Sequence, residues 1–305
     1  DCAGEMIEAW RVNGELGGEQ ADDVAEILHG LVELTFHSQR IARYLVEVLF
    51  AAECFDEAKR ALQAYVQLVE KAREAEASSD ANAHGEEVET QQNGEAQQQN
   101  HEKQQQQQQQ QANGTTTTTT SSKDYDTDEV YANTLAQGAY LVGRHCNDFA
   151  LADKIASKAL AVVQDKEGKF KPAFQKDAVL LARLKRVSGF AKAGLAIQLA
   201  DPVRRPVLQS EALSELTTAA QLDDQSSEAF YQLAFLQAEL RDVHSAIQSA
   251  RRAVELEPAD VESWHLLVLL LSAQKKYKDA FKIAEVALDE CDKDDKGASS
   301  GAVNG

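Results

Sequence analysis

Apolar residues recur along most of this chain at the spacing of one face of an α-helix. Near the N-terminus, Val24, Ile27, Leu28, Leu31 and Leu34 follow the i, i+3, i+4, i+7 rule of an amphipathic helix. Further apolar segments of helical period cover residues 41–52, 55–69, 130–143, 149–163, 174–199 and 208–222. The chain has only four prolines and is rich in Ala, Leu, Glu and Gln, which favour helices. The pattern therefore predicts an all-α protein.

The last part of the chain contains an internal repeat with a period of 34 residues, over 227–258 and 261–290. Its equivalent positions are Phe230, Leu233, Ala246, Ala250 and Ala253 in the first stretch, and Trp264, Leu267, Ala280, Ala284 and Ala287 in the second. This period, with an early aromatic residue and late alanines, is the signature of the tetratricopeptide repeat (TPR), a pair of antiparallel helices. The aromatic residue is expected to pack between layers, and the alanines to let helices cross closely. Because one pair cannot bury its apolar face alone, the pairs should stack into an α–α superhelix, or solenoid.

Earlier segments repeat the alanine spacing of this motif. They are Ala58, Leu62 and Tyr65, then Ala152, Ala156 and Ala159, and then Ala212, Leu216 and Ala219. We therefore assign TPR-like helices to residues 1–73 and a TPR solenoid to residues 125–290. Asp128 and Asp260 are expected to cap helices, and Pro202 and Pro206 to end the helix over 174–199. Gly189 and Gly194 in that helix should mark a close approach of helices.

Residues 74–124 form a low-complexity segment that separates the two helical parts. It contains Gln104–Gln111 and Thr115–Thr120 and has almost no aliphatic residues to bury. Such a composition predicts a disordered insertion, which a continuous solenoid can accommodate as a long loop. Assembly driven by the polyglutamine tract is the alternative interpretation. Residues 291–305, which are acidic and then small and polar, are expected to form a disordered tail.

The net charge of −19 limits the partners that this chain can have. It argues against direct binding of nucleic acid, and equally against direct binding of an anionic membrane. The four cysteines are far apart, as is usual for reduced thiols of a cytosolic protein. The longest apolar run, Trp264–Leu271, is too short to span a bilayer, and no secretory signal is visible. The thiols therefore indicate a cytoplasmic protein, and because the chain begins at Asp1 we interpret it as an internal fragment. If it is found at a membrane, we expect it there peripherally, through partners.

No catalytic motif stands out. The sequence lacks the GxGxxG, GxxxxGK[ST], HExxH and GxSxG patterns. His29 and His37 are eight residues apart on separate helices, so we expect no metal there. His145 and Cys146 lie at a helix end, where a turn or capping role is expected rather than nucleophilic catalysis. We therefore predict no enzyme activity, catalytic residue, metal or cofactor.

The expected binding surface is the concave side of the solenoid, formed by outward positions of each first helix. In the two regular repeats these positions are Glu228, Tyr231, Phe235, Ala238 and Glu239, then Glu262, His265, Leu269, Ser272 and Ala273. TPR domains that grip a C-terminal carboxylate use Lys, Arg and Asn there, so an acidic groove should repel such a ligand. The apolar residues instead suit a partner helix. Alternatively, Phe235 and Leu269 pack against the adjoining repeat.

The two repeats also resemble one particular family. The run VESWHLLVLLLSAQKKYKDAFKIAEVALDE at Val261–Glu290, after SSEAFYQLAFLQAELRDVHSAIQSARRAVELEP, resembles the tetratricopeptide repeat protein 7 family, including its fungal cargo-transport branch. The most specific part is WHLL-x-LLLSAQK-x-Y, from Trp264 to Tyr277. The resemblance implies an α-solenoid scaffold subunit of the plasma-membrane phosphatidylinositol 4-kinase complex. Such a subunit would link the kinase to a membrane-anchored partner and support phosphoinositide supply and endocytic traffic. It carries over no kinase-contacting residue.

Two other functions remain open from the residues alone. The chain could be a generic TPR adaptor for peptide tails or helical segments, including those of chaperones. It could also be a structural array in another assembly, such as a ubiquitin-ligase or RNA-decay complex. All three alternatives are protein-binding functions.

Overall fold

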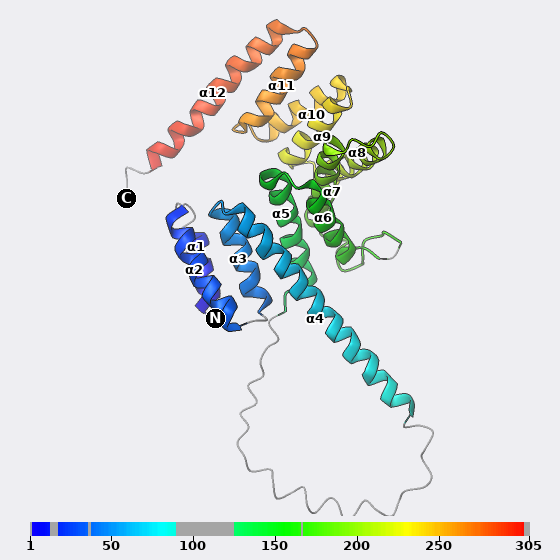
Figure 1. The fold of residues 1–305 in the computed structure, drawn as a ribbon. Coiled ribbons are helices and arrows are strands. Elements are labelled where there is room, and N and C mark those ends of the chain that lie inside the picture. Colours follow the sequence, from blue (N-terminus) through cyan, green and yellow to red (C-terminus); the bar gives the residue numbers. More distant parts are fainter. Residues whose placement is uncertain (1, 13–17, 36–37, 90–124, 166, 302–305) are drawn as a thin grey trace, which may run out of the picture. The chain divides into compact units, whose positions relative to one another are not determined.

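The computed structural model describes residues 2–12, 18–35, 38–89, 125–165 and 167–301, without the side chains of 2, 12, 18–20, 76–89 and 291–301. Within these ranges the regular elements are twelve α-helices, and the only β pairing is one isolated bridge between Gln164 and Phe170 (Figure 1). The predicted all-α class is confirmed. The chain divides into two compact units, residues 1–126 and residues 127–305.

The first unit contains four helices. They are α1 (Cys2–Val12), α2 (Gly18–Thr35), α3 (Gln39–Ala51) and α4 (Phe55–Glu89). The predicted pair is present, because α3 packs against α4 and buries the expected Ala58, Leu62 and Tyr65 completely.

The amphipathic α2 is also present, but it buries a different face from the predicted one. Its buried residues are Ala21, Ala25 and Leu28, whereas Ile27 and Leu34 are exposed. The period was therefore right and the face partly wrong, because Ala21 and Ala25 lie beside Leu28 on the packed side, where Ile27 and Leu34 do not.

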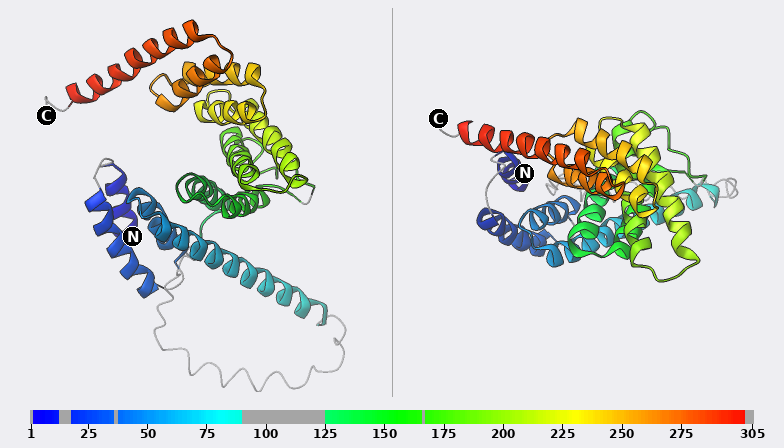
Figure 2. Two further views of the ribbon diagram at one scale, coloured as in Figure 1. Left: turned by 45° about the horizontal axis from the view of Figure 1, so that its top comes forward. Right: turned by 90° about the horizontal axis from the view of Figure 1, so that it is seen from above.

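The second unit contains eight helices in sequence. They are α5 (Asp128–Cys146), α6 (Phe149–Val163), α7 (Ala178–Gln198), α8 (Arg204–Leu222), α9 (Ser227–Glu239), α10 (Val243–Leu256), α11 (Val261–Ala273) and α12 (Tyr277–Gly301). Each helix packs on the next one in the chain, and the first helices of successive pairs, α5, α7, α9 and α11, also contact each other in order (Figure 2). This is the predicted α–α superhelix.

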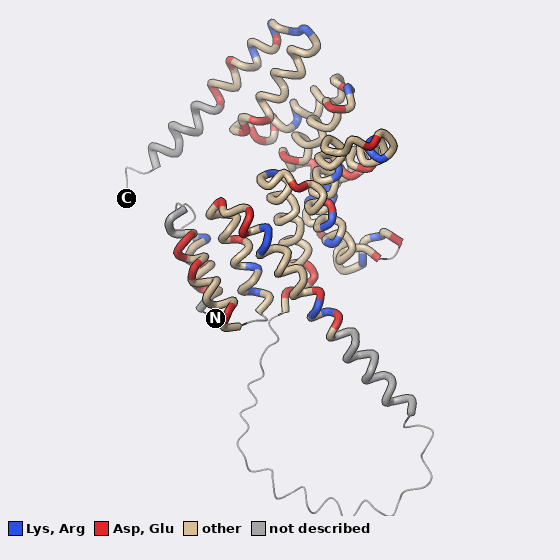
Figure 3. Tube along the Cα trace, viewed as in Figure 1, with Lys and Arg blue, Asp and Glu red and all other residues tan. Residues whose placement is uncertain are grey.

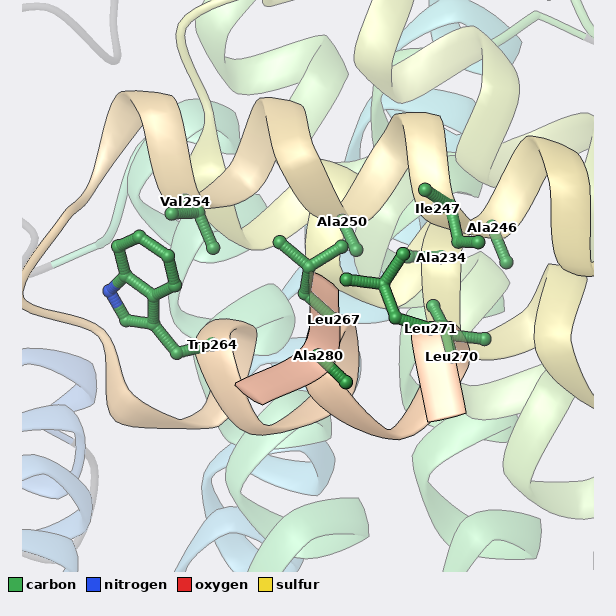
Figure 4. Packing of buried hydrophobic residues seen from close by; sticks show 10 residues of the cluster. All are labelled: Ala234, Ala246, Ile247, Ala250, Val254, Trp264, Leu267, Leu270, Leu271 and Ala280. Atoms are coloured by element: carbon green, nitrogen blue, oxygen red, sulfur yellow. The ribbon is translucent and has the colours of Figure 1, made fainter. Parts of the chain in front are cut away.

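The core between α10 and α11 shows why the repeat has its residue types. Ala246 and Ala250 of α10 are completely buried, and Leu267 and Leu271 of α11 fill the space beside them (Figure 4). Trp264 lies next to Val254, and its Nε1–H donates to the Pro258 carbonyl at 2.7 Å. The aromatic residue thus packs between helices as predicted, while it also ties down the loop that precedes α11.

Other predicted packing positions follow the same plan where a neighbour covers them. Leu233, Ala253 and Ala280 are buried, and Phe230 is half-buried against the core formed by α8 and α9. Ala284 and Ala287 of α12 are only half-buried. Among the described residues no helix covers the outer face of α12, which accounts for this difference.

Four helix pairs turn at a residue in the left-handed region that is not glycine. Glu53, Asn147, Arg241 and Lys275 have φ between 54° and 66°, one in each turn of α3–α4, α5–α6, α9–α10 and α11–α12. After three of these residues, the next N–H donates back to a carbonyl five residues earlier: Cys54 to Leu49, Asp242 to Gln237 and Lys276 to Leu271. That bond is the Schellman ending of a helix. The same turn therefore recurs in both units.

Several helix ends differ from the predicted ones. Thr127, not Asp128, caps α5, and its side chain accepts from the Val130 N–H. Asp177 caps α7, which therefore begins at Ala178. Pro206 lies in the first turn of α8, where a missing N–H costs no hydrogen bond, instead of ending α7. Asp260 caps α11 as predicted and accepts from the N–H groups of Glu262 and Ser263.

Two helices run beyond the residues assigned to them. Helix α4 continues past Glu74 to Glu89, through a segment rich in Ala and Glu that favours helix. Helix α12 continues past Glu290 to Gly301. The rest of the predicted insertion, residues 90–124 with both homopolymer tracts, and the last residues of the tail lie outside the described residues.

Asp126 binds to side chains of α3 and α4 through hydrogen bonds and an ion pair. Its carboxylate accepts from Tyr65 Oη at 2.7 Å and from Arg43 Nε at 3.1 Å, and its backbone N–H donates to Gln39 Oε1 at 3.0 Å. Gln39 is itself buried. Side chains of α3 and α4 thus hold the residue that comes directly before Thr127, the cap of α5.

Candidate functional site

The inner helices of the second unit are joined by a network of charged and aromatic side chains. Arg144 of α5 pairs with Glu262 of α11 at 2.5 Å and donates to Tyr140 Oη at 3.1 Å. Arg186 of α7 pairs with Glu228 of α9 at 2.5 Å. Its guanidinium also lies 5.2 Å from the centroid of the Tyr140 ring. One network therefore links four successive pairs.

This network changes the interpretation of Glu228 and Glu262. The sequence predicts that both belong to an acidic groove, but each carboxylate pairs with an arginine from another helix. Figure 3 shows acidic and basic positions interleaved along the helices of this unit. Both glutamates therefore lie in ion pairs and contribute less free negative charge to this surface than expected.

The same surroundings raise the pKa of two tyrosines. Burial, followed by the negative charge of Glu228, raises the pKa of Tyr140 to about 12, although Arg144 acts in the opposite direction. Burial, followed by the charge of Glu262, also raises the pKa of Tyr231. The hydrogen bond from Arg144 to Glu262 raises the pKa of the guanidinium above its ordinary value. At neutral pH the network therefore contains two ion pairs and uncharged phenols.

An apolar pocket of about 480 Å³ lies beside this network, and we call it the α5–α9 pocket. Most of its lining comes from α5, α7 and α9. The lining residues are Gly143, Arg144, Asn147, Phe149, Phe190, Ala193, Gly194, Ile197, Gln198, Leu216, Tyr231, Gln232 and Phe235. Its volume lies in the ordinary range for sites that bind a large side chain or a small molecule.

Glycines shape the wall of this pocket. A Cβ at Gly194 would lie 2.2 Å from the Phe149 ring, and one at Gly143 would lie 2.7 Å from the Phe190 ring. The two rings meet edge to face with centroids 5.4 Å apart. A third glycine, Gly189, gives the same close approach to Leu216 of α8. The predicted close approaches at Gly189 and Gly194 are confirmed.

Gln232, one of the lining residues, carries an unpaired oxygen that is buried from solvent. Gln232 is only 7% exposed, and its Oε1 has no hydrogen-bond partner among the residues that the structure describes. The nearby Gln198 already donates through Nε2 to the Asn147 carbonyl at 2.8 Å. Buried polar groups are nearly always paired, so Gln232 Oε1 is an exception within this core.

The predicted concave-face residues fall into two groups. Tyr231 and Phe235 line the pocket, whereas Glu239, His265 and Leu269 are exposed and are not part of its lining. Phe235 is 42% exposed and Leu269, its equivalent one repeat later, is 52% exposed. The alternative that an adjoining repeat covers these two side chains is therefore wrong. Ala238 and Ser272 are half-buried, and Ala273 is exposed.

Sequence reasoning did not find several pocket residues, among them Phe149, Phe190, Ile197 and Gln232. The two phenylalanines and Ile197 come from the earlier, irregular pairs, where no 34-residue register marks the inner face. A glutamine within the otherwise apolar run of α9 was the one available signal for Gln232.

Among the described residues, no three or more His, Cys, Asp and Glu side chains are grouped so that they could hold a metal ion. No helix within the described ranges has the length and apolar character needed to cross a bilayer.

The fold and this inner surface define a helical-repeat protein of the TPR type, a class that acts as adaptor or scaffold for protein partners. No family model matches the chain. Over 110 residues it is 37% identical to tetratricopeptide repeat protein 7B of Homo sapiens, a match that covers 34% of this chain and 13% of that protein. Protein NPGR2 of Arabidopsis thaliana is 32% identical over 117 residues, or 37% of this chain and 16% of that protein.

The chain thus matches less than one fifth of the length of these curated relatives. Among solved structures, a thermophilic TPR protein of Thermus thermophilus aligns with a TM-score of 0.41 and 19% identity, over 55% of this chain and 82% of that one.

Proposed function

We propose that this chain is a non-enzymatic TPR scaffold that holds a protein partner on the inner surface of its second unit. The observation that carries the proposal is the α5–α9 pocket, which is apolar, opens on the inner helices and has an exposed Phe235 at its edge. The ion pairs of Arg144 and Arg186 fix the helices around it. A preorganised apolar surface of this kind suits a partner helix or extended segment.

The partner that we propose is a phosphatidylinositol 4-kinase at the plasma membrane, whose recruitment or stabilisation would support endocytic traffic. Two observations support it. The motif from Trp264 to Tyr277 resembles the tetratricopeptide repeat protein 7 family, and the human member of that family is 37% identical over 110 residues. With a net charge of −19, the protein would reach an anionic membrane through a membrane-anchored partner, not by direct contact. We propose no cofactor and no nucleic-acid partner.

The test is to purify the tagged protein from cells and identify the bound proteins by mass spectrometry. Recovery of the kinase and its membrane anchor is expected, together with a fall in phosphatidylinositol 4-phosphate when the protein is depleted. Phe235→Asp should reduce recovery, whereas Val203→Ala, an exposed apolar position outside the pocket, should not. Unchanged phosphatidylinositol 4-phosphate after depletion, with no kinase recovered, would contradict the kinase function.

The alternative is an adaptor for a peptide or helical segment in another assembly, such as a chaperone, ubiquitin-ligase or RNA-decay complex. The pairing of Glu228 and Glu262 favours it, because it removes a source of repulsion for acidic peptides. Recovery of such an assembly without the kinase would identify this alternative.

A further inference from the structure

We propose that the outer face of α12 binds the same face of a second copy of this chain, with the two helices antiparallel about a two-fold axis. This self-association is independent of the proposed function, because it involves no other protein. Three observations carry it: the exposed apolar residues of this face, the covered equivalent face of α10, and the order of the charges along α12.

One apolar stripe of α12 is open to solvent. Its members lie at the spacing i, i+4, i+7 and i+11, which places them on one side of the helix. They are Tyr277, Phe281, Ala284 and Leu288, and we call them the α12 stripe. The three large side chains among them are 63–69% exposed. Large apolar side chains that are exposed side by side mark an interaction surface.

The internal repeat shows what happens to this face where it has a neighbour. Ile247 and Val254 of α10 occupy the positions equivalent to Phe281 and Leu288, and they are each 7% exposed in the core that α10 forms with α11. The α12 stripe thus matches a packed surface in position and character. Among the described residues, no helix covers it as α11 covers α10.

The charges beside the stripe have an unusual order. Four exposed residues follow one line along the helix, namely Lys278, Lys282, Glu285 and Asp289. Within the described part of the chain, none of their side chains has an ion-pair or hydrogen-bond partner. Within α12 this order is unfavourable, because the two lysines are like charges at i, i+4, and so are the two acids. The equivalent positions of α10 are His244, Gln248, Arg251 and Glu255, so the repeat itself does not require this order.

An antiparallel second copy converts this order into attraction. In such a pair, the flank of one helix lies beside the same flank of the other helix, turned end for end. Lys278 then lies opposite Asp289 of the second copy, and Lys282 lies opposite Glu285. The two-fold axis repeats both contacts, as in any isologous interface. A parallel copy would place the two charged flanks on opposite sides and gain none of these pairs. The charge order therefore selects an antiparallel copy of this chain as the occupant.

The apolar residues fit the same arrangement. The two-fold axis places Phe281 opposite Ala284 of the second copy, so that the large ring meets the smallest member of the stripe. Tyr277 then lies opposite Leu288. Facing positions that alternate in size let two helices interdigitate. The apolar pairs and the charged pairs are centred within one residue of each other along α12, so one axis satisfies both sets.

The pairing is expected to be weak and reversible. One pair of helices buries less than the about 1,200 Å² of a standard interface, so we expect a Kd of about 10–100 µM. The net charge of −19 makes two copies repel each other, but salt at about 0.15 M screens charges beyond about 8 Å. At about 1 µM the chain is then monomeric, and denaturation at that concentration reports a chain in which Phe281 is exposed.

Sedimentation equilibrium of the full 305-residue chain tests the apolar contact. Wild type should give a reversible monomer–dimer equilibrium between about 1 and 300 µM. Phe281→Asp should stay monomeric over this range, because it would bury a carboxylate without a partner. Val286→Asp is the matched control, because Val286 is 45% exposed on the same helix but lies outside the stripe and its charged flank. Circular dichroism checks that each variant keeps its helical content.

Charge variants test the antiparallel order. Lys278→Glu combined with Lys282→Glu should weaken self-association at least about tenfold, because the acids of one copy then face acids of the other. Adding Glu285→Lys and Asp289→Lys exchanges all four charges, keeps the net charge and restores complementarity. This exchanged variant should therefore dimerise like wild type. It should not form mixed dimers with fluorescently labelled wild type in sedimentation velocity, because each lysine would then meet a lysine.

Three results would overturn the inference. They are a wild-type chain that stays monomeric at about 300 µM, dimerisation of Phe281→Asp as strong as that of wild type, and mixed dimers of the exchanged variant with wild type as strong as wild-type dimers. A monomeric wild type would assign the α12 stripe to another occupant, such as a helix of a different protein or a further repeat. None of these measurements includes another protein, so each result leaves the kinase function to its own test.

Discussion

At the scale of single residues, Trp264 does two things with one side chain. Its ring packs against α10, and its N–H holds the Pro258 carbonyl in the loop that joins the two repeats. Apolar burial and a loop hydrogen bond are therefore combined at the position that the repeat reserves for a large aromatic residue.

We predict different costs for two substitutions of Trp264. Trp264→Ala should lower the free energy of unfolding by roughly 3–5 kcal/mol, since it leaves a cavity in the core. Trp264→Phe should cost less, because most of the ring remains and the main loss is one hydrogen bond, about 1 kcal/mol. Urea denaturation measures both. Equal stability of Trp264→Ala and the wild type would show that this register is misassigned.

Lys275, which has a left-handed backbone conformation, allows a substitution that should stabilise the protein. A residue with a side chain is destabilised by about 1–2 kcal/mol at the φ of 60° that Lys275 adopts. Glycine avoids this strain, but it lowers the free energy of unfolding by about 0.5–1 kcal/mol because it gives the unfolded chain more entropy. Lys275→Gly should therefore be neutral or stabilising by up to about 1 kcal/mol. Lys275→Val should destabilise, because β-branched residues fit this region badly. A higher melting temperature for Lys275→Val than for Lys275→Gly would contradict the assigned turn.

Tyr140 should make stability depend on alkaline pH. Its pKa is about 12 in the folded chain and about 10 when exposed in the unfolded chain, so folding favours the protonated phenol. This contribution is complete below pH ~10 and is lost as the pH rises toward 12. The free energy of unfolding of wild type should therefore fall more steeply over that interval than that of Tyr140→Phe. Parallel curves would show that Tyr140 ionises normally.

At the scale of elements, α10 and α12 show what one neighbouring helix does. Ile247 and Val254 of α10 are each 7% exposed beneath α11, whereas their equivalents 34 residues later, Phe281 and Leu288 of α12, are 66% and 69% exposed. The sequence positions are equivalent, and only the presence of a covering helix differs.

We expect paired substitutions to reveal this difference. Ile247→Ala should lower the free energy of unfolding by about 2–5 kcal/mol, as is usual for a buried large-to-small change. Phe281→Ala should change it by less than about 0.5 kcal/mol, as is usual for an exposed position. Denaturation of both variants under the same conditions is the measurement, and a larger loss at Phe281 would mean that α12 is covered after all.

The same comparison explains what the sequence could predict. The period identified the helices and the buried alanines of α6, α8 and α10, because these depend on neighbours close in sequence. It could not predict that Arg144 pairs with Glu262, which is 118 residues away, or that Gln232 lies in a pocket with Phe149. Those contacts depend on how successive pairs stack. The packed face of α2 was only partly predicted, since Ala21 and Ala25 give a weaker hydrophobic signal than the exposed Ile27 and Leu34.

At the scale of the whole molecule, the dominant property is the charge of −19. An acidic chain is repelled by an anionic lipid surface, and basic residues of the inner helices such as Arg144 and Arg186 are occupied in ion pairs.

Liposome flotation tests this property directly. Vesicles with acidic lipid should recover little of the isolated chain, at low as well as physiological salt, because attraction to basic patches is not available to it. Vesicles of neutral lipid are the control. Strong recovery that depends on acidic lipid would show a direct membrane site and remove the need for an anchoring partner.

The contacts of Asp126 have a consequence for changes in the length of the glutamine run. Gln39, Arg43 and Tyr65 determine where the chain rejoins the first unit, and all three lie before the homopolymer tracts. Because Asp126 is held by side chains and not by the number of residues before it, a longer or shorter run at Gln104–Gln111 leaves its three partners in place. The register of Asp126 on α3 and α4 is therefore independent of the length of that run.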